Sequence, residues 1–191
     1  MNVGTGVIFL GIALVVALPG AVSAESARRS NPPPELHADD LAQRIHALVN
    51  VERKKAGLTT LAWNKALAAI AQEHSRDMAD RNYFAHESPE GRDFGYRYQQ
   101  AKFDCAVRAG KLIWTGAENI ALSRLYNSFH RVNNITTYDW NTPADIARKT
   151  VEGWMVSPGH RVNILTIHWR QQGIGVVIAS ENQILITQNF C

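Results

Sequence analysis

Motifs of covalent catalysis are absent from this chain. Its 191 residues include no Gly-x-Ser-x-Gly elbow of the kind that presents a serine nucleophile. Only two cysteines occur, Cys105 and Cys191, and neither has the sequence context of a catalytic thiol. The sequence therefore gives no positive sign of a covalent hydrolase.

The presence of only two cysteines also limits the chain to one intramolecular disulfide. An isolated cysteine pair in an oxidising compartment is usually a disulfide. A bridge between Cys105 and Cys191 would close a loop of about 85 residues, which the chain-entropy model values at about 4 kcal/mol. We expect this intramolecular bridge; the alternatives are two free thiols, or a bridge from Cys191 to a second molecule.

Concentrated charge of one sign is lacking as well. The net charge is +3, and the only short basic runs are at residues 28–29 and 53–55. Nucleic-acid-binding surfaces typically combine a basic stripe with exposed aromatic residues. The scattered basic residues here indicate a solvated surface instead, so nucleic acid is not an expected partner.

The first 24 residues contain no charged side chain. An apolar run covers residues 7–18, Pro19-Gly20 interrupts it, and small residues precede Glu25. This pattern predicts a signal peptide over residues 1–24 that is cleaved after Ala24. Because about 20 apolar residues can also span a bilayer, an uncleaved membrane anchor is the alternative. We expect a secreted or periplasmic protein, or a membrane-anchored one if the leader stays.

The rest of the chain divides into a Pro-rich linker at residues 25–38 and one α+β domain at residues 39–191. The run Asn31-Pro-Pro-Pro34 favours extended polyproline geometry in the linker. Apolar spacing predicts two helices, from about Asp39 to Gly57 and from about Asn64 to Asp80.

Beyond these two helices, the sequence predicts turns, strands and a further helix. Thr142-Pro-Ala-Asp145 predicts a capped helix that ends at Pro158-Gly159. The remaining expectations are a turn-rich stretch at 82–111, a strand around Glu118, a long polar loop at 127–141, and a hairpin formed by 173–179 and 184–190.

Three residues stand out as candidates for chemistry: His86, Glu118 and His160. Two neutral imidazoles and a carboxylate match the ligand set of open zinc sites, and the same groups can perform acid–base catalysis. Asn119 is expected to orient Glu118 or the backbone. Ser157, beside Pro-Gly, is expected to serve a turn or a helix end rather than to act as a nucleophile.

Three motifs follow one another along the chain: Phe84-Ala-His86-Glu-Ser-Pro-Glu-Gly91, Gly116-Ala-Glu-Asn-Ile-Ala121, and Trp154-Met-Val-Ser-Pro-Gly-His-Arg-Val-Asn-Ile-Leu165. In this order they resemble the bacterial branch of the CAP superfamily, a superfamily that includes cysteine-rich secretory, antigen 5 and pathogenesis-related proteins. The resemblance spans about Leu41 to Phe190 and implies a single α-β-α sandwich with a central antiparallel sheet.

The resemblance also implies a cavity. His86 and Glu118 match the family's first His and first Glu, and His160 matches its second His. The second acidic residue of eukaryotic members falls near Ser157, so the tetrad is incomplete here and Glu152 is a weak substitute. Since some members bind zinc or another divalent cation, a three-ligand site of His86, His160 and Glu118 is the expectation.

The leading functional hypothesis is therefore an exported, monomeric CAP-domain protein that acts by binding. The resemblance implies a sterol- or fatty-acid-like ligand, a divalent cation, or a cell-surface protein as its partner. The first alternative is a zinc-dependent hydrolase. The second is a structural or defence-related surface module in which the loop at 127–141 performs recognition.

Overall fold

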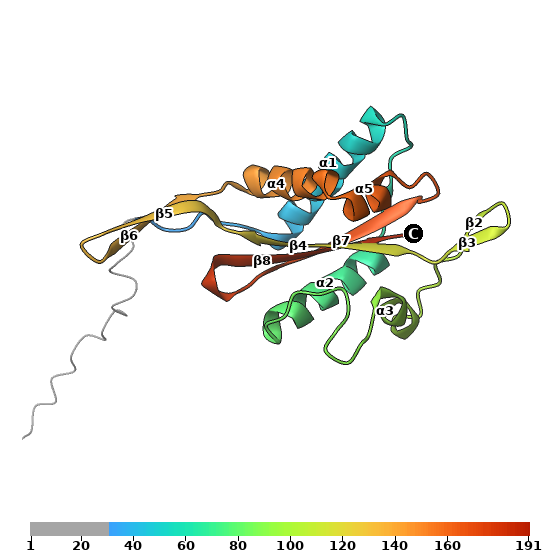
Figure 1. Ribbon diagram of the computed structural model, residues 1–191, viewed down its shortest axis with the longest axis horizontal. Helices are drawn as coiled ribbons and strands as arrows, with labels where there is room; N and C mark the ends of the chain where they lie inside the picture. The colour runs from blue at the N-terminus through green and yellow to red at the C-terminus, as the bar shows by residue number, and fades with distance from the viewer. Residues whose placement is uncertain (1–30) are drawn as a thin grey trace, which may run out of the picture.

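The computed structural model describes residues 31–191, so the predicted signal peptide and residues 25–30 of the predicted linker lie outside the described residues. A four-stranded sheet separates two layers of helices, with α1, α4 and α5 on one face and α2 and α3 on the other (Figure 1). This is the expected α+β sandwich. The helices are α1 (Ala38–Lys55), α2 (Lys65–Asp80), α3 (Phe94–Gln100), α4 (Pro143–Val156) and α5 (Pro158–Leu165).

The central sheet has the strand order β1-β7-β8-β4. The pairs β7–β8 and β8–β4 are antiparallel, as expected, whereas the two-residue edge strand β1 runs parallel to β7, which makes the sheet mixed. Its strands are β1 (Ala62–Trp63), β4 (Ala117–Arg124), β7 (Gln171–Ile178) and β8 (Gln183–Phe190). The predicted C-terminal hairpin is thus confirmed as β7 and β8, joined by a short 3₁₀ turn at Ser180–Asn182.

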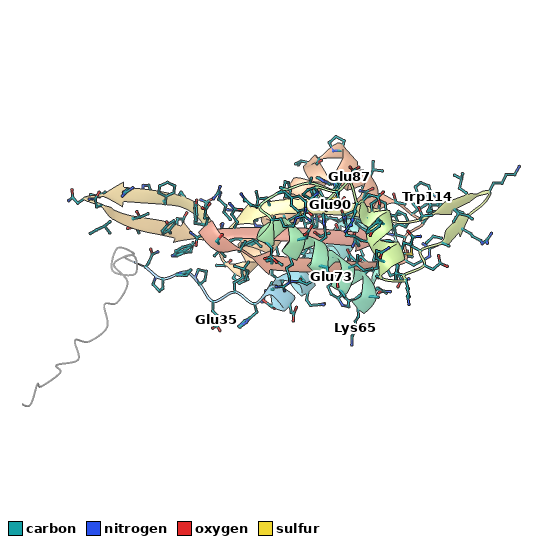
Figure 2. All side chains as sticks on the ribbon, turned by 90° about the horizontal axis from the view of Figure 1, so that it is seen from below. Glu35, Lys65, Glu73, Glu87, Glu90 and Trp114 are labelled. Atoms are coloured by element: carbon teal, nitrogen blue, oxygen red, sulfur yellow. A yellow bond between two sulfur atoms is a disulfide. The ribbon has the colours of Figure 1, made fainter. Side chains whose placement is uncertain are left out.

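Two further hairpins project from opposite ends of the sandwich (Figures 1 and 2). They are β2 (Val107–Ala109) with β3 (Leu112–Trp114), and β5 (Tyr126–Val132) with β6 (Ile135–Trp140). The second hairpin corrects the long loop predicted at 127–141. Asn133 and Asn134 both have positive φ, which lets a two-residue turn reverse the chain, and aromatic side chains of β5 and β6 stack on one another.

The segment after α4 also differs from the prediction. Pro158-Gly159 does not end the helical region but opens α5, with Pro158 in its first turn and Ser157 at the helix boundary. Proline suits this position because the first helical N–H needs no intrahelical acceptor. His160 therefore lies on the first turn of a helix rather than in an open turn.

Several local predictions are confirmed. Asn64 caps α2 by accepting the N–H of Leu67, and Thr142 and Asp145 form the reciprocal capping box of α4. The turn-rich stretch is only partly right, because it contains α3. The disulfide Cys105–Cys191 is formed and ties the segment after α3 to the end of β8.

Helix α2 lies unusually close to the sheet because β7 carries glycine where it passes. A Cβ atom on Gly173 would lie 2.0 Å from the backbone nitrogen of Ala68, and one on Gly175 would lie 2.1 Å from that of Gln72. The Gln72 side chain bonds both the N–H and the carbonyl of Val176, as a neighbouring strand would. Backbone packs directly on backbone here, which fixes the position of every residue of α2.

Helix α1 contacts α5 on the face of the sheet opposite to α2. Its apolar residues recur at helical spacing and are buried at Leu41, Ile45 and Val49. The fully buried Arg53 donates from Nη1 to the carbonyl of Ile164, 2.6 Å away, near the end of α5. Within the described residues 31–191, every core residue lies between Leu36 and Cys191, so residues 25–191 contain all of them.

No helix within residues 31–191 combines the length and apolar character that a membrane crossing needs.

Candidate functional site

A pocket of about 600 Å³ opens where the segment after α2, strand β4 and the start of α5 meet. Four predicted site residues line it: His86, Glu118, Ser157 and His160. The fifth, Asn119, is fully buried behind the pocket wall. The structure therefore brings together side chains that the sequence separates by more than seventy positions.

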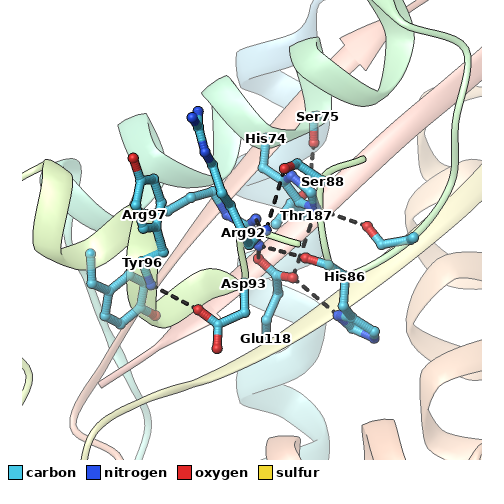
Figure 3. A network of polar contacts seen from close by, with 12 residues as sticks. His74, Ser75, His86, Ser88, Arg92, Asp93, Tyr96, Arg97, Glu118 and Thr187 are labelled. Carbon is cyan, nitrogen blue, oxygen red and sulfur yellow. Dashed lines mark hydrogen bonds and ion pairs between the residues drawn. The ribbon is translucent and has the colours of Figure 1, made fainter. Parts of the chain in front are cut away.

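Glu118 is the most buried of the lining groups, with 1% of its side chain exposed. Strand β4 directs it toward the α2 face, where both carboxylate oxygens are bonded (Figure 3). Oε1 accepts from Nδ1 of His86 at 3.0 Å, and Oε2 accepts from Nη2 of Arg97 at 2.7 Å. A buried carboxylate is stable only with such partners, because desolvation of the charge must be offset.

Arg97 was not among the predicted site residues. It lies on α3, and its Nη2 also donates to the carbonyl of His86 at 3.0 Å, while Nη1 donates to the carbonyl of Arg92 at 2.9 Å. No local sequence signal marks it, since it is one arginine on a short helix within a stretch that reads as turns.

His74 joins the same network from α2. Its ring is buried, and Nε2 donates to the carbonyl of Ala85 at 3.0 Å and lies 3.8 Å from Oε1 of Glu118. Burial lowers the pKa of His74, and the nearby Glu118 carboxylate only partly offsets this. The side chain has the packing environment expected from the sequence, and it also contacts the site.

His160 faces His86 across the pocket, with 6.3 Å between the ring centroids. Partial burial, and then the proximity of His86, lower the pKa of His160. Its imidazole is therefore neutral at pH 7, the form that can donate a lone pair to a metal or accept a proton. His86 is more open to solvent, with 49% of its side chain exposed.

Two asparagines, the buried Asn119 and the half-buried Asn163, fix the backbone around His160. Asn119 donates to the His160 carbonyl at 3.3 Å and to Oε1 of Gln188 at 3.0 Å. Asn163 donates to the Glu118 carbonyl at 3.1 Å and to Oδ1 of Asn119 at 2.9 Å. These amides connect α5 to the edge of β4, so the distance between the two imidazoles depends on them.

The described residues contain no group of three or more His, Cys, Asp and Glu side chains arranged to hold a metal ion. The hydrogen bonds explain why. Glu118 directs its oxygens at His86 and Arg97 instead of sharing the pocket with the imidazoles as a third ligand. His86 and His160 are the two donors that remain available to a metal.

The fold and the motifs define the class of protein. Residues 46–190 match the family model described as "CAP: Cysteine-rich secretory protein family". The chain belongs to this family.

Individual relatives agree with this assignment. The chain is 32% identical over 148 residues to the "Uncharacterized protein YkwD" of Bacillus subtilis (strain 168), covering 78% of this chain and 46% of that protein. The crystal structure of an extracellular protein containing a SCP domain from Bacillus anthracis str. Ames is 29% identical, with a TM-score of 0.57, over 80% of this chain and 40% of that one. This chain thus spans less than half the length of either.

More distant structures share the fold alone. The crystal structure of NaASP2 with Zn²⁺ is 14% identical, has a TM-score of 0.50 and covers 83% of both chains.

Proposed function

We propose that this CAP domain is exported and binds a divalent cation, zinc in the first instance, between His86 and His160. One observation carries the proposal: two imidazoles face each other across one pocket, and the Nδ1 of His86 is bonded to a buried carboxylate. Zinc-binding histidines commonly donate their second ring nitrogen to a carboxylate in this way, which leaves the other nitrogen as the ligand.

The residues fit the ion in their chemistry. Imidazole nitrogen is a preferred zinc donor, and a neutral His160 offers its lone pair without losing a proton. Zinc held by two protein ligands keeps positions open for water or for a group from a partner molecule. When bound, the ion would act as a Lewis acid in the pocket. Export is supported by the leader pattern and the disulfide, and the relative described as extracellular agrees with it.

A small apolar ligand is the second candidate, since Pro158 and Val162 line the same pocket and Val162 is 65% exposed. Apolar side chains beside two imidazoles would suit a fatty-acid- or sterol-like molecule with one polar end. Hydrolysis by a zinc-activated water and recognition of a surface protein are further alternatives. For the latter, the exposed hairpin of β5 and β6 replaces the predicted loop.

Zinc titration by calorimetry at pH 7.5 tests the proposal on metal-free residues 25–191. We expect micromolar or tighter binding in the parent and its loss in His86→Ala/His160→Ala. The matched control is His130→Ala, which removes an exposed histidine from the distant β5 strand and should bind as the parent does.

No zinc binding by the parent would contradict the proposal. Titration with a fatty acid would then test the apolar ligand. If zinc binds, assays of esters and peptides with and without chelator would distinguish a binding site from a hydrolase.

A further inference from the structure

Arg97 connects the segment that carries His86 to the carboxylate of Glu118. Its guanidinium donates to the carbonyls of His86 and Arg92, which are the two ends of the segment 86–92, and to the carboxylate of Glu118. Its side chain is 13% exposed, and its Nε is buried without a hydrogen-bond partner among the described residues. Among the described residues, the Arg97 side chain therefore makes its hydrogen bonds through Nη1 and Nη2.

We infer that Arg97 is a positioning residue that fixes both the place and the tautomer of His86. This inference deepens the proposed function and rests on it only where zinc is the readout. Arg97 donates a hydrogen bond to Oε2 of Glu118, so Oε1 is left to accept a hydrogen bond from Nδ1 of His86. Because a carboxylate only accepts, Nδ1 of His86 carries the hydrogen and Nε2 keeps its lone pair.

Charge balance supports this role. Glu118 is almost fully buried, and an unpaired buried carboxylate would be strongly destabilising. The Arg97 guanidinium lies 2.7 Å from Oε2 of Glu118 and supplies the opposite charge that a buried carboxylate needs. Lysine could not reproduce the arrangement, since its single nitrogen lacks the planar fork that serves three oxygens at once.

The substitution Glu118→Gln tests the inference through the tautomer. If Arg97 dictates the side-chain orientation, it will hold the amide oxygen and turn the amide NH₂ toward His86. Nδ1 would then have to accept, and His86 would switch to the tautomer with hydrogen on Nε2. Long-range ¹H–¹⁵N spectra at pH 8 of residues 25–191 distinguish the two tautomers by their ring ¹⁵N shifts.

We expect the Nδ1–H tautomer in the parent, the Nε2–H tautomer in Glu118→Gln, and a mixture in Arg97→Met. Zinc affinity should fall at least tenfold in both variants. Arg92→Met is the matched control, because the Arg92 side chain lies over the ring of Tyr96 and only its backbone carbonyl meets Arg97. It should keep the parent spectrum and the parent affinity.

An Nε2–H tautomer in the parent would overturn the inference. So would an unchanged His86 spectrum in Glu118→Gln, or in Arg97→Met if Glu118→Gln does not fold. These outcomes differ from a failure of the proposed function. A parent that binds no zinc contradicts the metal site, whereas the tautomer result still decides the role of Arg97.

Discussion

The imidazole rings of His86 and His160 lie 6.3 Å apart although one follows α2 and the other begins α5. The two residues are held by different contacts: the His86 ring is bonded to Glu118, and the backbone carbonyl of His160 accepts from the side-chain amide of Asn119. The proximity of His86 also disfavours a proton on His160 and so lowers the pKa of His160.

This proximity predicts how His160 titrates. Its pKa should lie below 6.5, because burial and the neighbouring His86 both disfavour the imidazolium. In His86→Ala the pKa of His160 should rise but stay below 6.5, since burial is the larger cause. Following the His160 ring protons by NMR between pH 4.5 and 8 measures both values. A pKa that does not move in His86→Ala would show that the rings do not interact.

Stability should fall in mild acid because of His74. Burial holds the pKa of His74 below 6.5, so the unfolded chain binds a proton more readily than the native protein does. By linkage, the free energy of unfolding is highest above pH 6.5 and decreases as the pH falls toward the native pKa. Urea unfolding at pH 7.5, 6.5 and 5.5 measures the decrease.

The variant His74→Gln should show a smaller decrease than the parent over this range. His37→Gln removes an exposed histidine and should follow the parent curve. Equal slopes in His74→Gln and the parent would assign the acid sensitivity to other groups. His46, whose pKa burial also lowers, would be the next group to test.

Removing the disulfide should cost much of the stability. Cys105 and Cys191 are 86 positions apart, and a loop of this length contributes about 4 kcal/mol in the chain-entropy model. Cys105→Ala/Cys191→Ala should therefore unfold at a clearly lower urea concentration. Parent protein in reductant should match the double variant, and a loss below about 1 kcal/mol would contradict this estimate.

Gly175→Ala should be severely destabilising. Its new methyl carbon would meet the backbone of Gln72 at 2.1 Å, and backbone atoms cannot move aside as a flexible side chain does. We expect a loss of about 3 kcal/mol or more, or failure to fold. Gly153→Ala in α4 is the matched control, because it meets nothing within 4 Å and should stabilise its helix by about 0.5–1 kcal/mol. Thermal unfolding of both variants measures the contrast.

Local signals account for what could be predicted from the sequence. Thr142 and Asp145 define a helix start within four residues, and the apolar spacing of α1 identifies its buried face. The motifs also singled out four residues that the structure places around one pocket. None of these features needs information about distant parts of the chain.

The missed features depend on contacts that no local pattern encodes. The β5–β6 hairpin reads as a polar loop because its turn uses two asparagines and its strands contain many polar residues among the aromatic ones. Arg97, the second partner of Glu118, could not be predicted either, since α3 itself was missed. The sequence grouped Glu118 with His86 and His160 but could not show which groups would bond its two oxygens.

The close approach of α2 to β7 makes α2 less able to move than the segment 86–92, which lies beside the pocket. Gly173 and Gly175 leave no space between helix and strand, so α2 cannot shift to accommodate a different ligand. The segment 86–92 is mostly exposed and is held by hydrogen bonds from Arg97 and Arg81 rather than by buried apolar packing, so substitutions there should disturb the core less. Changes in ligand selectivity, whether engineered or evolved, should therefore accumulate in that segment while the helix behind it stays unchanged.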